Sequence, residues 1–338
     1  MRVSLFTVRL WGSGRRSGSI AGKIALAGLA ALLVLGGCGG DPSRGQAGAR
    51  TASGTGPVVV CTTGMIGDLA SRLVSDRGTV VTLMGPGVDP HLYKATPSDL
   101  VAMQRADLIL YNGLHLEGKM ADLFARLREQ GRRTVAVAEA IPRDRLLSAR
   151  GAGDAVDPHV WFDVELWTLA LGRVRDALLE ADPAGRAEYE AREAAYRAEL
   201  DELQQWCRRA AESVRVERRV LVTSHDAFGY FGRAYGFEVV ALQGISTVAE
   251  AGLADVTALV RFIRERGIPA IFVESSVSPA MIRRVAEDAG ARVGGELYSD
   301  AVGPSGSPAG TYPGMIRHNV RTIAGALGGS VEEVPHAP

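Results

Sequence analysis

Three of the six histidines in this 338-residue chain share polar loop surroundings, next to Asp, Ser or Pro. They are His91, His159 and His225. Neutral imidazole is a general ligand for transition metals, and the carboxylate of Asp300 would complete a set of four ligands without a thiolate. The residue types therefore predict a site for zinc, manganese or iron(II) formed by His91, His159, His225 and Asp300.

The four candidate ligands are far apart along the chain, so only the fold can bring them together. Consecutive members are separated by 68, 66 and 75 residues. A single histidine in such a loop is more often a hydrogen-bonded structural or surface residue than a ligand. However, His91, His225 and Asp300 follow predicted strands, and His159 lies on the loop leading into a helix that begins near Val164. Loops at the carboxyl ends of strands line the ligand crevice of open α/β sheets. We therefore expect two ligands from each half of the protein.

The elements that must position these loops form a repeating pattern. Short apolar, β-branched runs alternate with stretches long enough for a helix, which favours parallel sheets. We expect strands at residues 58–62, 80–83, 108–111, 134–138, 219–223, 238–241, 270–273 and 291–294. The predicted fold class is α/β, with two lobes that each contain a four-stranded, mainly parallel sheet flanked by helices.

One long helix is predicted between the two sets of strands, over residues 187–215. It has an apolar stripe, contains no Gly or Pro and follows the start signal Asp182-Pro183. At 1.5 Å per residue its length is about 40 Å, enough to run across both lobes. The pattern fits a stiff connector and a surface helix of one lobe equally well.

The N-terminal residues predict export. The first 23 residues contain five basic residues and no acid. The apolar run that follows, at 24–35, is too short to span a bilayer comfortably. The sequence Leu35-Gly36-Gly37-Cys38 resembles the lipobox of bacterial lipoproteins, in which the cysteine is lipidated after cleavage. The alternative is an ordinary signal peptide with an accidental cysteine. Residues 41–56 are rich in small residues and predict a flexible tether.

Composition excludes some classes of function. The whole chain has 38 basic and 38 acidic residues. Removal of the signal segment deletes five basic residues and leaves a net charge of −5, which disfavours nucleic-acid binding. No Cys-x-x-Cys is present, so a thiolate metal cluster is not predicted. After lipidation of Cys38, Cys61 and Cys207 remain, and the sequence leaves open whether they pair.

Several longer motifs, which occur in order along almost the whole mature chain, resemble the TroA-like zinc/manganese solute-binding lipoproteins of ABC importers. The motifs are Gly85-Pro86-Gly87-Val88-Asp89-Pro90-His91-Leu92-Tyr93, Tyr111-Asn112-Gly113-Leu114-His115-Leu116-Glu117, Asp157-Pro158-His159-Val160-Trp161-Phe162-Asp163, Ser224-His225-Asp226-Ala227-Phe228-Gly229-Tyr230-Phe231, Gln243-Gly244-Ile245-Ser246-Thr247, Phe272-Val273-Glu274-Ser275-Ser276-Val277 and Leu297-Tyr298-Ser299-Asp300.

The resemblance implies two Rossmann-like lobes joined by one rigid helix, with the metal bound between them by the four candidate ligands. His115 lies in a matching motif but outside the ligand set. Glu274 is a candidate hydrogen-bond acceptor for a ligand imidazole, with a structural turn cap as the alternative. The expected ranges are a lipoprotein signal peptide at 1–37, a tether at 38–56, an N-terminal α/β lobe at 57–186, a linker helix at 187–215 and a C-terminal α/β lobe at 216–333.

The resemblance also implies partners and a location. We expect a monomer, exported and lipid-anchored to the bacterial cell membrane, that faces the periplasm or cell exterior and delivers a divalent metal ion to an ABC permease. The Irving–Williams order favours zinc over manganese at such a site. In contrast, the stretch 143–157 lacks the histidine-rich loop common in dedicated zinc members, and residues 111–120 are more similar to the manganese branch. Manganese is therefore favoured, with zinc a close second and iron possible.

Two other classes of function use the same features. A metal-dependent hydrolase would need an open coordination position for water and a general base such as Asp226 or Glu274. Four protein ligands leave little room for that water. A surface adhesin is the second alternative, and the sequence does not discriminate it from transport. We expect a receptor and not an enzyme.

Overall fold

The computed structural model describes residues 56–149 and 155–331. The predicted signal peptide, the lipidation site Cys38 and nearly all of the tether lie outside these residues. Within the described ranges, no helix combines the length and the apolar character needed to cross a bilayer. The expectations about the N-terminal anchor therefore stay predictions.

The first lobe is built on a four-stranded parallel sheet in the order β2-β1-β3-β4. Its strands are β1 (Val58–Cys61), β2 (Thr79–Thr82), β3 (Leu108–Tyr111) and β4 (Thr134–Ala136), and its helices are α1 (Gly64–Val74), α2 (Pro97–Arg105), α3 (Ala121–Glu129) and α4 (Val164–Ala181). Short 3-10 turns lie at Gly118–Met120, Ala138–Ala140, Arg143–Arg145 and Val160–Phe162. The predicted strands and the observed strands agree to within two residues at each end.

Capping residues set the helix starts nearest the candidate ligands. Thr96 and Asp99 form a reciprocal capping box at the start of α2, with Pro97 at its first position. Asp163 caps α4 by accepting hydrogen bonds from the backbone N–H groups of Glu165 and Leu166. These caps end the loops that carry His91 and His159 at defined residues.

The second lobe contains the other four strands, and all of its pairings are parallel. The strands are β5 (Val220–His225), β6 (Glu238–Gln243), β7 (Ala270–Glu274) and β8 (Arg292–Leu297), and the helices are α6 (Gly229–Tyr235), α7 (Leu253–Arg266), α8 (Ala280–Ala289) and α9 (Tyr312–Ala326). The strands hydrogen-bond as two pairs, β5 with β6 and β7 with β8. The sequence predicted one continuous sheet here. β5 and β7 lie side by side, and the Glu274 side chain bridges their ends by accepting from two backbone N–H groups of β5.

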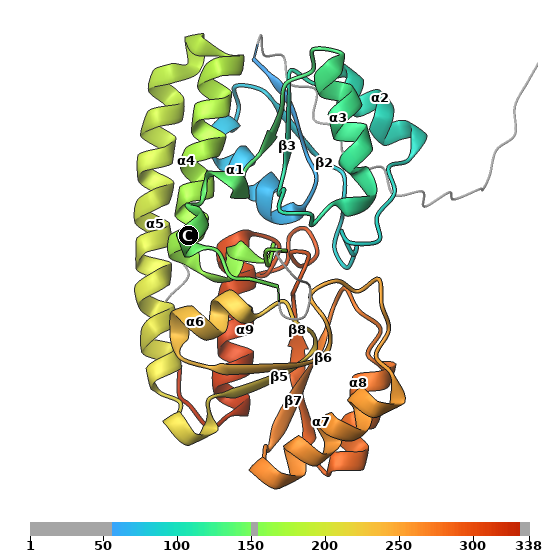
Figure 1. Cartoon of the computed structure of the whole chain (residues 1–338). Coiled ribbons are helices and arrows are strands. Elements are labelled where there is room, and N and C mark those ends of the chain that lie inside the picture. Colours follow the sequence, from blue (N-terminus) through green and yellow to red (C-terminus); the bar gives the residue numbers. More distant parts are fainter. Residues whose placement is uncertain (1–55, 150–154, 332–338) are drawn as a thin grey trace, which may run out of the picture. The chain divides into compact units, whose positions relative to one another are not determined.

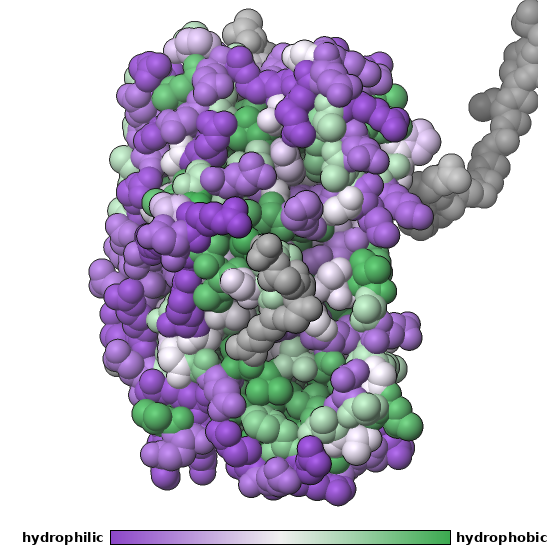
Figure 2. Space-filling model, in the orientation of Figure 1, coloured by the Kyte–Doolittle hydropathy of each residue, from purple (hydrophilic) through white to green (hydrophobic). Residues whose placement is uncertain are grey.

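The predicted long helix is α5 (Arg186–Glu212), which begins after a 3-10 turn at Pro183–Gly185 and is followed by another at Val216–Arg218. It runs alongside both lobes: α1 and α4 contact it from the first, and α6 and α9 from the second (Figure 1). Its apolar stripe is buried, whereas hydrophilic side chains cover the outer edge of the molecule where α4 and α5 lie (Figure 2). α5 is therefore the connector and not a surface helix of one lobe.

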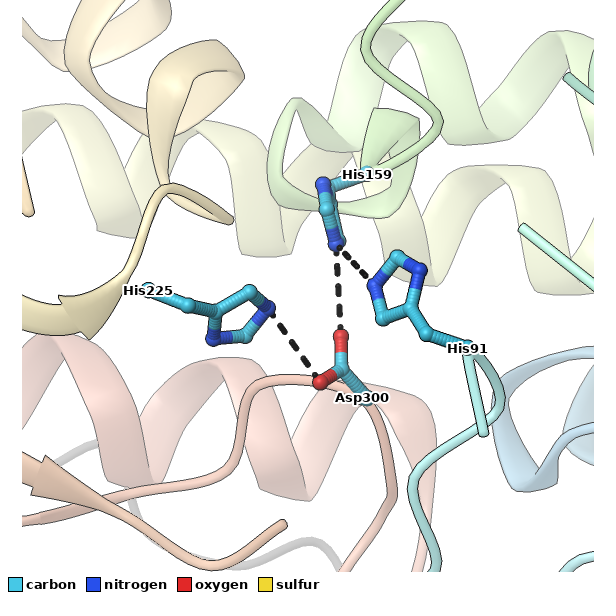
Figure 3. A group of neighbouring side chains, drawn as sticks. All are labelled: His91, His159, His225 and Asp300. Atoms are coloured by element: carbon cyan, nitrogen blue, oxygen red, sulfur yellow. Dashed lines mark hydrogen bonds and ion pairs between the residues drawn. The ribbon is translucent and has the colours of Figure 1, made fainter. Parts of the chain in front are cut away.

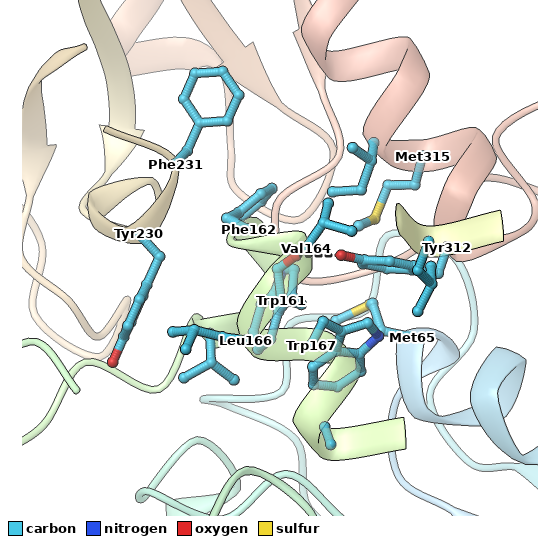
Figure 4. Packing of buried hydrophobic residues seen from close by; sticks show 14 of the residues in the cluster. Met65, Trp161, Phe162, Val164, Leu166, Trp167, Tyr230, Phe231, Tyr312 and Met315 are labelled. Atoms are coloured by element: carbon cyan, nitrogen blue, oxygen red, sulfur yellow. Dashed lines mark hydrogen bonds between the residues drawn. The ribbon is translucent and has the colours of Figure 1, made fainter. Parts of the chain in front are cut away.

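A single hydrophobic cluster continues from the first lobe into the second. Trp161 and Trp167 are fully buried next to Tyr312 of α9, whose hydroxyl donates to the backbone oxygen of Trp161 at 2.7 Å (Figure 4). Cys61 and Cys207 belong to this cluster, and both are buried free thiols. The open question about their pairing is thus answered in the described structure, where they form no disulfide.

Candidate metal centre

The four candidate ligands come from four connections at the junction of the lobes. His91 lies between β2 and α2, and His159 directly precedes the turn at Val160–Phe162. His225 is the last residue of β5, and Asp300 follows β8. All four side chains are buried and point toward one another, with one ligand atom of each inside a group whose members lie within 4.8 Å (Figure 3). The structure brings together all four residues that the sequence predicted.

The distances inside this group suit coordination of one ion. Nε2 of His91 lies 3.2 Å from Nε2 of His159. The two carboxylate oxygens of Asp300 lie 3.4 Å from Nε2 of His159 and 3.3 Å from Nε2 of His225. Ligand atoms about 2.1 Å from a tetrahedral metal would be separated from each other by about 3.4 Å. These three spacings are close to this edge length, and the ligand atoms of the whole group lie within 4.8 Å of one another.

Two of the candidate ligand imidazoles have a buried carboxylate on the nitrogen that faces away from the group. Oδ1 of Asp157 lies 2.7 Å from Nδ1 of His159 and accepts the backbone N–H of the same histidine at 2.9 Å. Oε2 of Glu274 lies 2.5 Å from Nδ1 of His225. Such acceptors fix the tautomer that presents Nε2 to a metal. Because Glu274 also accepts two backbone N–H groups of β5, its position fits both alternatives, the acceptor for an imidazole and the structural cap.

The role of Asp157 was missed from the sequence. Asp-Pro-His occurs twice, and in both copies the aspartate accepts the backbone N–H of the histidine two residues later, at 2.8 Å for Asp89 and 2.9 Å for Asp157. This repeated local turn was the available signal. The repeated turn does not reveal that Asp157 also hydrogen-bonds to the imidazole of His159. Asp89 makes no such bond to the imidazole of His91.

The charges in the group shift the pKa values of its members in opposite directions. Burial lowers the pKa of His91 to about 3. Burial also opposes protonation of His159 and His225, but the neighbouring carboxylates raise the pKa of His159 to about 9 and that of His225 well above its usual value. Although burial alone would raise the pKa of Asp300, the two imidazoles hold it well below the usual range. The charges of Asp300, His159 and His225 thus stabilise one another, whereas burial disfavours a charge on His91.

Two buried atoms in the group are polar and lack a hydrogen bond in the described structure. They are Nε2 of His225 and Oδ1 of Asp300. The second carboxylate oxygen of Asp300 accepts from the hydroxyl of Ser276 at 2.9 Å. Buried polar atoms are normally satisfied, and here both atoms face the centre of the group. A divalent cation at that point would satisfy them, so the residues fit a metal ion.

The motif at residues 111–117 supports the His159 loop and does not join the ligand group. The buried carboxylate of Glu117 accepts from the backbone of Asn112 and Gly113 and from the hydroxyl of Thr62. The Asn112 amide then donates to the backbone oxygen of Pro158, next to His159, at 3.1 Å. His115 is exposed, with a φ of 65°, and lies outside the site, as predicted.

Comparison with known proteins identifies the family of this chain. Residues 59–326 match the family model described as "Zinc-uptake complex component A periplasmic". The chain is 48% identical to zinc-binding protein TroA of Treponema pallidum over 286 residues, which covers 83% of this chain and 92% of TroA. It is 44% identical to manganese-binding lipoprotein MntA of Bacillus subtilis over 304 residues, which covers 88% of this chain and 97% of MntA.

The solved structure of the periplasmic zinc-binding protein TroA from Treponema pallidum has the same fold as this chain, with a TM-score of 0.78. It is 48% identical and covers 80% of this chain and 99% of the TroA chain. A two-lobed α/β protein with a buried group of three histidines and one aspartate between its lobes thus has both sequence and structural counterparts. The chain belongs to the zinc-uptake complex component A family, which includes TroA-type metal-binding receptors.

Proposed function

We propose that this protein is the extracytoplasmic metal-binding receptor of an ABC importer. It captures one divalent transition-metal ion through His91, His159, His225 and Asp300 and delivers it to a membrane permease. The observation that carries this proposal is the convergence of three imidazoles and one carboxylate from both lobes, within 4.8 Å and buried. The chain belongs to a family whose description names a component of a zinc-uptake complex, and this supports the transport role.

The two lobes contribute equally to capture. His91 and His159 come from the first lobe, and His225 and Asp300 from the second, so a bound ion links the lobes. Histidine ligands must be neutral to coordinate, so the ion replaces the protons of the metal-free group, and capture weakens as the pH falls. Release then requires the permease to disturb one of the four ligand loops.

Manganese is the favoured cargo, with zinc a close second and iron possible. Both oxygens of Asp300 face the imidazoles, so the site offers up to five donor atoms. Manganese accepts such higher, oxygen-containing coordination, whereas zinc prefers four ligands and binds tightly to imidazole. The site should therefore bind zinc in vitro whichever ion is transported. The curated relatives include one named for zinc and one named for manganese.

The same geometry argues for a receptor and against an enzyme. A catalytic metal keeps a coordination position open for water or substrate. Here four protein ligands surround the proposed metal position, and their side chains are 0–5% exposed. Glu274, one of the two bases considered for a hydrolase, is held by His225 and by the backbone of β5.

The proposal includes the anchor and the division of the chain. Cys38 is the lipidated residue, and residues 38–56 tether the protein to the outer face of the membrane. The N-terminal lobe spans 57–186, the linker helix 187–215 and the C-terminal lobe 216–333. The protein acts as a monomer, without a nucleic-acid partner.

The transport role is tested by metal uptake in cells that lack this protein. Expression of the full chain should restore uptake of radioactive manganese, zinc or both. His159→Ala should not restore uptake, and Cys38→Ser should release the protein from the membrane. Restoration by His159→Ala would contradict the proposed role of the site. Uptake that is unaffected by loss of the protein would contradict the importer assignment.

A further inference from the structure

The two Asp-Pro-His copies use their carboxylates differently. Asp157 binds the imidazole of its own His159. In the other copy, Asp89 does not bind the imidazole of His91, and no carboxylate among the described residues hydrogen-bonds to Nδ1 of His91. The second oxygen of Asp89 accepts instead from the hydroxyl of Thr247, at 2.5 Å, across the junction between the lobes. One copy therefore orients a ligand, and the other joins the lobes.

The His159 loop is fixed on several sides by residues of the second lobe. Tyr230 of α6 donates to the backbone oxygen of Asp157 at 2.9 Å and accepts from the backbone of Leu147. The indole N–H of Trp161 donates to the backbone oxygen of Ser299, next to Asp300, at 3.0 Å. The hydroxyl of Tyr312 also donates to the backbone oxygen of Trp161 (Figure 4). Together these bonds tie His159 and Asp300 into one unit.

His225 belongs to the same fixed unit because it ends a strand. Both its backbone N–H and its Nδ1 are bound by Glu274 of β7. Three of the four candidate ligands are thus held by buried hydrogen bonds to neighbouring elements. Such support keeps ligands in place in the absence of metal.

The His91 loop has fewer hydrogen bonds to the second lobe, although its ends are held within the first lobe. Residues 83–96 connect β2 to α2 without any helix or strand, a long connection for a compact fold. Leu92, next to the ligand, is 49% exposed. Among the described residues, this loop is hydrogen-bonded to the second lobe through the hydroxyl of Thr247, which donates to Asp89. Thr247 itself lies in the connection between β6 and α7.

From this asymmetry we propose that the Asp89–Thr247 hydrogen bond is a latch that holds the His91 loop over the captured ion and sets how fast the ion leaves. This inference rests on the proposed function. His91 is then the ligand that detaches first, and the other three remain assembled. Thr247 is a positioning residue that acts through Asp89 and does not touch the ion.

Substitution of Thr247 tests the latch without altering a candidate ligand. Thr247→Val removes the hydroxyl and keeps the shape of the side chain. Loss of one hydrogen bond to a carboxylate at a partly exposed site should speed release about ten-fold, because affinity changes of this kind act mainly on dissociation. Thr247→Ser keeps the hydroxyl, so this variant should release the ion at the wild-type rate.

The matched control is Thr257→Val in α7, where the hydroxyl donates to the backbone oxygen of Leu253 away from the site. Zinc-loaded protein is mixed with excess fluorescent chelator, and the release rate and the zinc bound per chain are measured. Faster release in Thr247→Val alone, with one zinc per chain and the metal-free melting temperature of the wild type, is the expected result.

Equal release rates for Thr247→Val and wild type would overturn the latch while leaving the receptor proposal intact. Equally fast release from Thr247→Ser would also overturn it, because the hydroxyl would then not matter. A wild-type protein that binds no zinc would instead contradict the proposed function, on which the latch depends.

Discussion

Glu274 joins a backbone and an imidazole: one carboxylate oxygen accepts the backbone N–H groups of Ser224 and His225, and the other lies 2.5 Å from Nδ1 of His225. Its side chain thereby links the ends of β5 and β7, which share no backbone pairing. The same residue orients a candidate ligand and closes the gap between the two strand pairs. Substitution by glutamine, which keeps an oxygen for the two backbone N–H groups, should therefore affect metal affinity more than folding.

Glu274→Gln should weaken metal binding by about 10- to 100-fold. The amide oxygen can still accept the two backbone N–H groups, but its NH2 faces Nδ1 and favours the tautomer with a proton on Nε2, which cannot coordinate. Competition with a chelator of known affinity measures the change. Glu296→Gln, an exposed position on β8, is the control and should bind as the wild type does. Unchanged affinity in Glu274→Gln would mean that the carboxylate does not orient His225.

Glu117→Gln should lower the free energy of unfolding of the metal-free protein by about 2 kcal/mol. Each carboxylate oxygen of Glu117 accepts a backbone N–H group, from Asn112 or from Gly113. In glutamine an NH2 group replaces one of these oxygens, so this NH2 would face a backbone N–H group and both would be donors. Urea denaturation measures the change. Glu139→Gln nearby is exposed, and its effect should stay within about 0.5 kcal/mol. Equal stability of the two variants would contradict a structural role for Glu117.

The Arg77–Asp182 pair predicts a pH dependence of stability. The hydrogen bond from Arg77 holds the pKa of Asp182 below its usual value. A lowered acid pKa stabilises the fold above the unfolded-state pKa of about 3.9, and this stabilisation is lost as the pH falls through the folded-state value. Asp182→Asn should cost about 1 kcal/mol at pH 7.

The stability difference between wild type and Asp182→Asn should shrink as the pH is lowered from 5 toward 3, when urea denaturation is followed across this range. Glu188→Gln removes the other carboxylate near Arg77. Since Glu188 is 46% exposed, this control should show little change at any pH. A difference that stays constant down to pH 3 would show that the Asp182 charge does not contribute.

The strands and all four members of the ligand group could be predicted from the sequence. Each strand is a short apolar run, and His91, His225 and Asp300 lie at or just after the ends of such runs, so local patterns place them at one edge of the sheets. His159 lies instead on the loop that leads into α4. His225 was predicted to follow the strand at 219–223, and it is instead the last residue of β5.

The contacts that hold the ligands could not be predicted in the same way. Thr247 and Asp89 are 158 residues apart, and Trp161 and Ser299 are 138 apart. No local pattern marks such pairs, because they arise only when the two lobes pack. For the same reason, the division of the second set of strands into two hydrogen-bonded pairs was not visible in their apolar runs.

Metal titration of the stripped protein tests the central claim most directly. Manganese and zinc are added separately, and bound metal per chain and the melting temperature are measured. We expect one equivalent per chain and about 2.7 kcal/mol of stabilisation at a free metal concentration 100 times Kd. Both should be lost in His159→Ala and Asp300→Ala but kept in His115→Ala. Stoichiometric binding that survives the first two substitutions, or no binding by the wild type, would contradict the account.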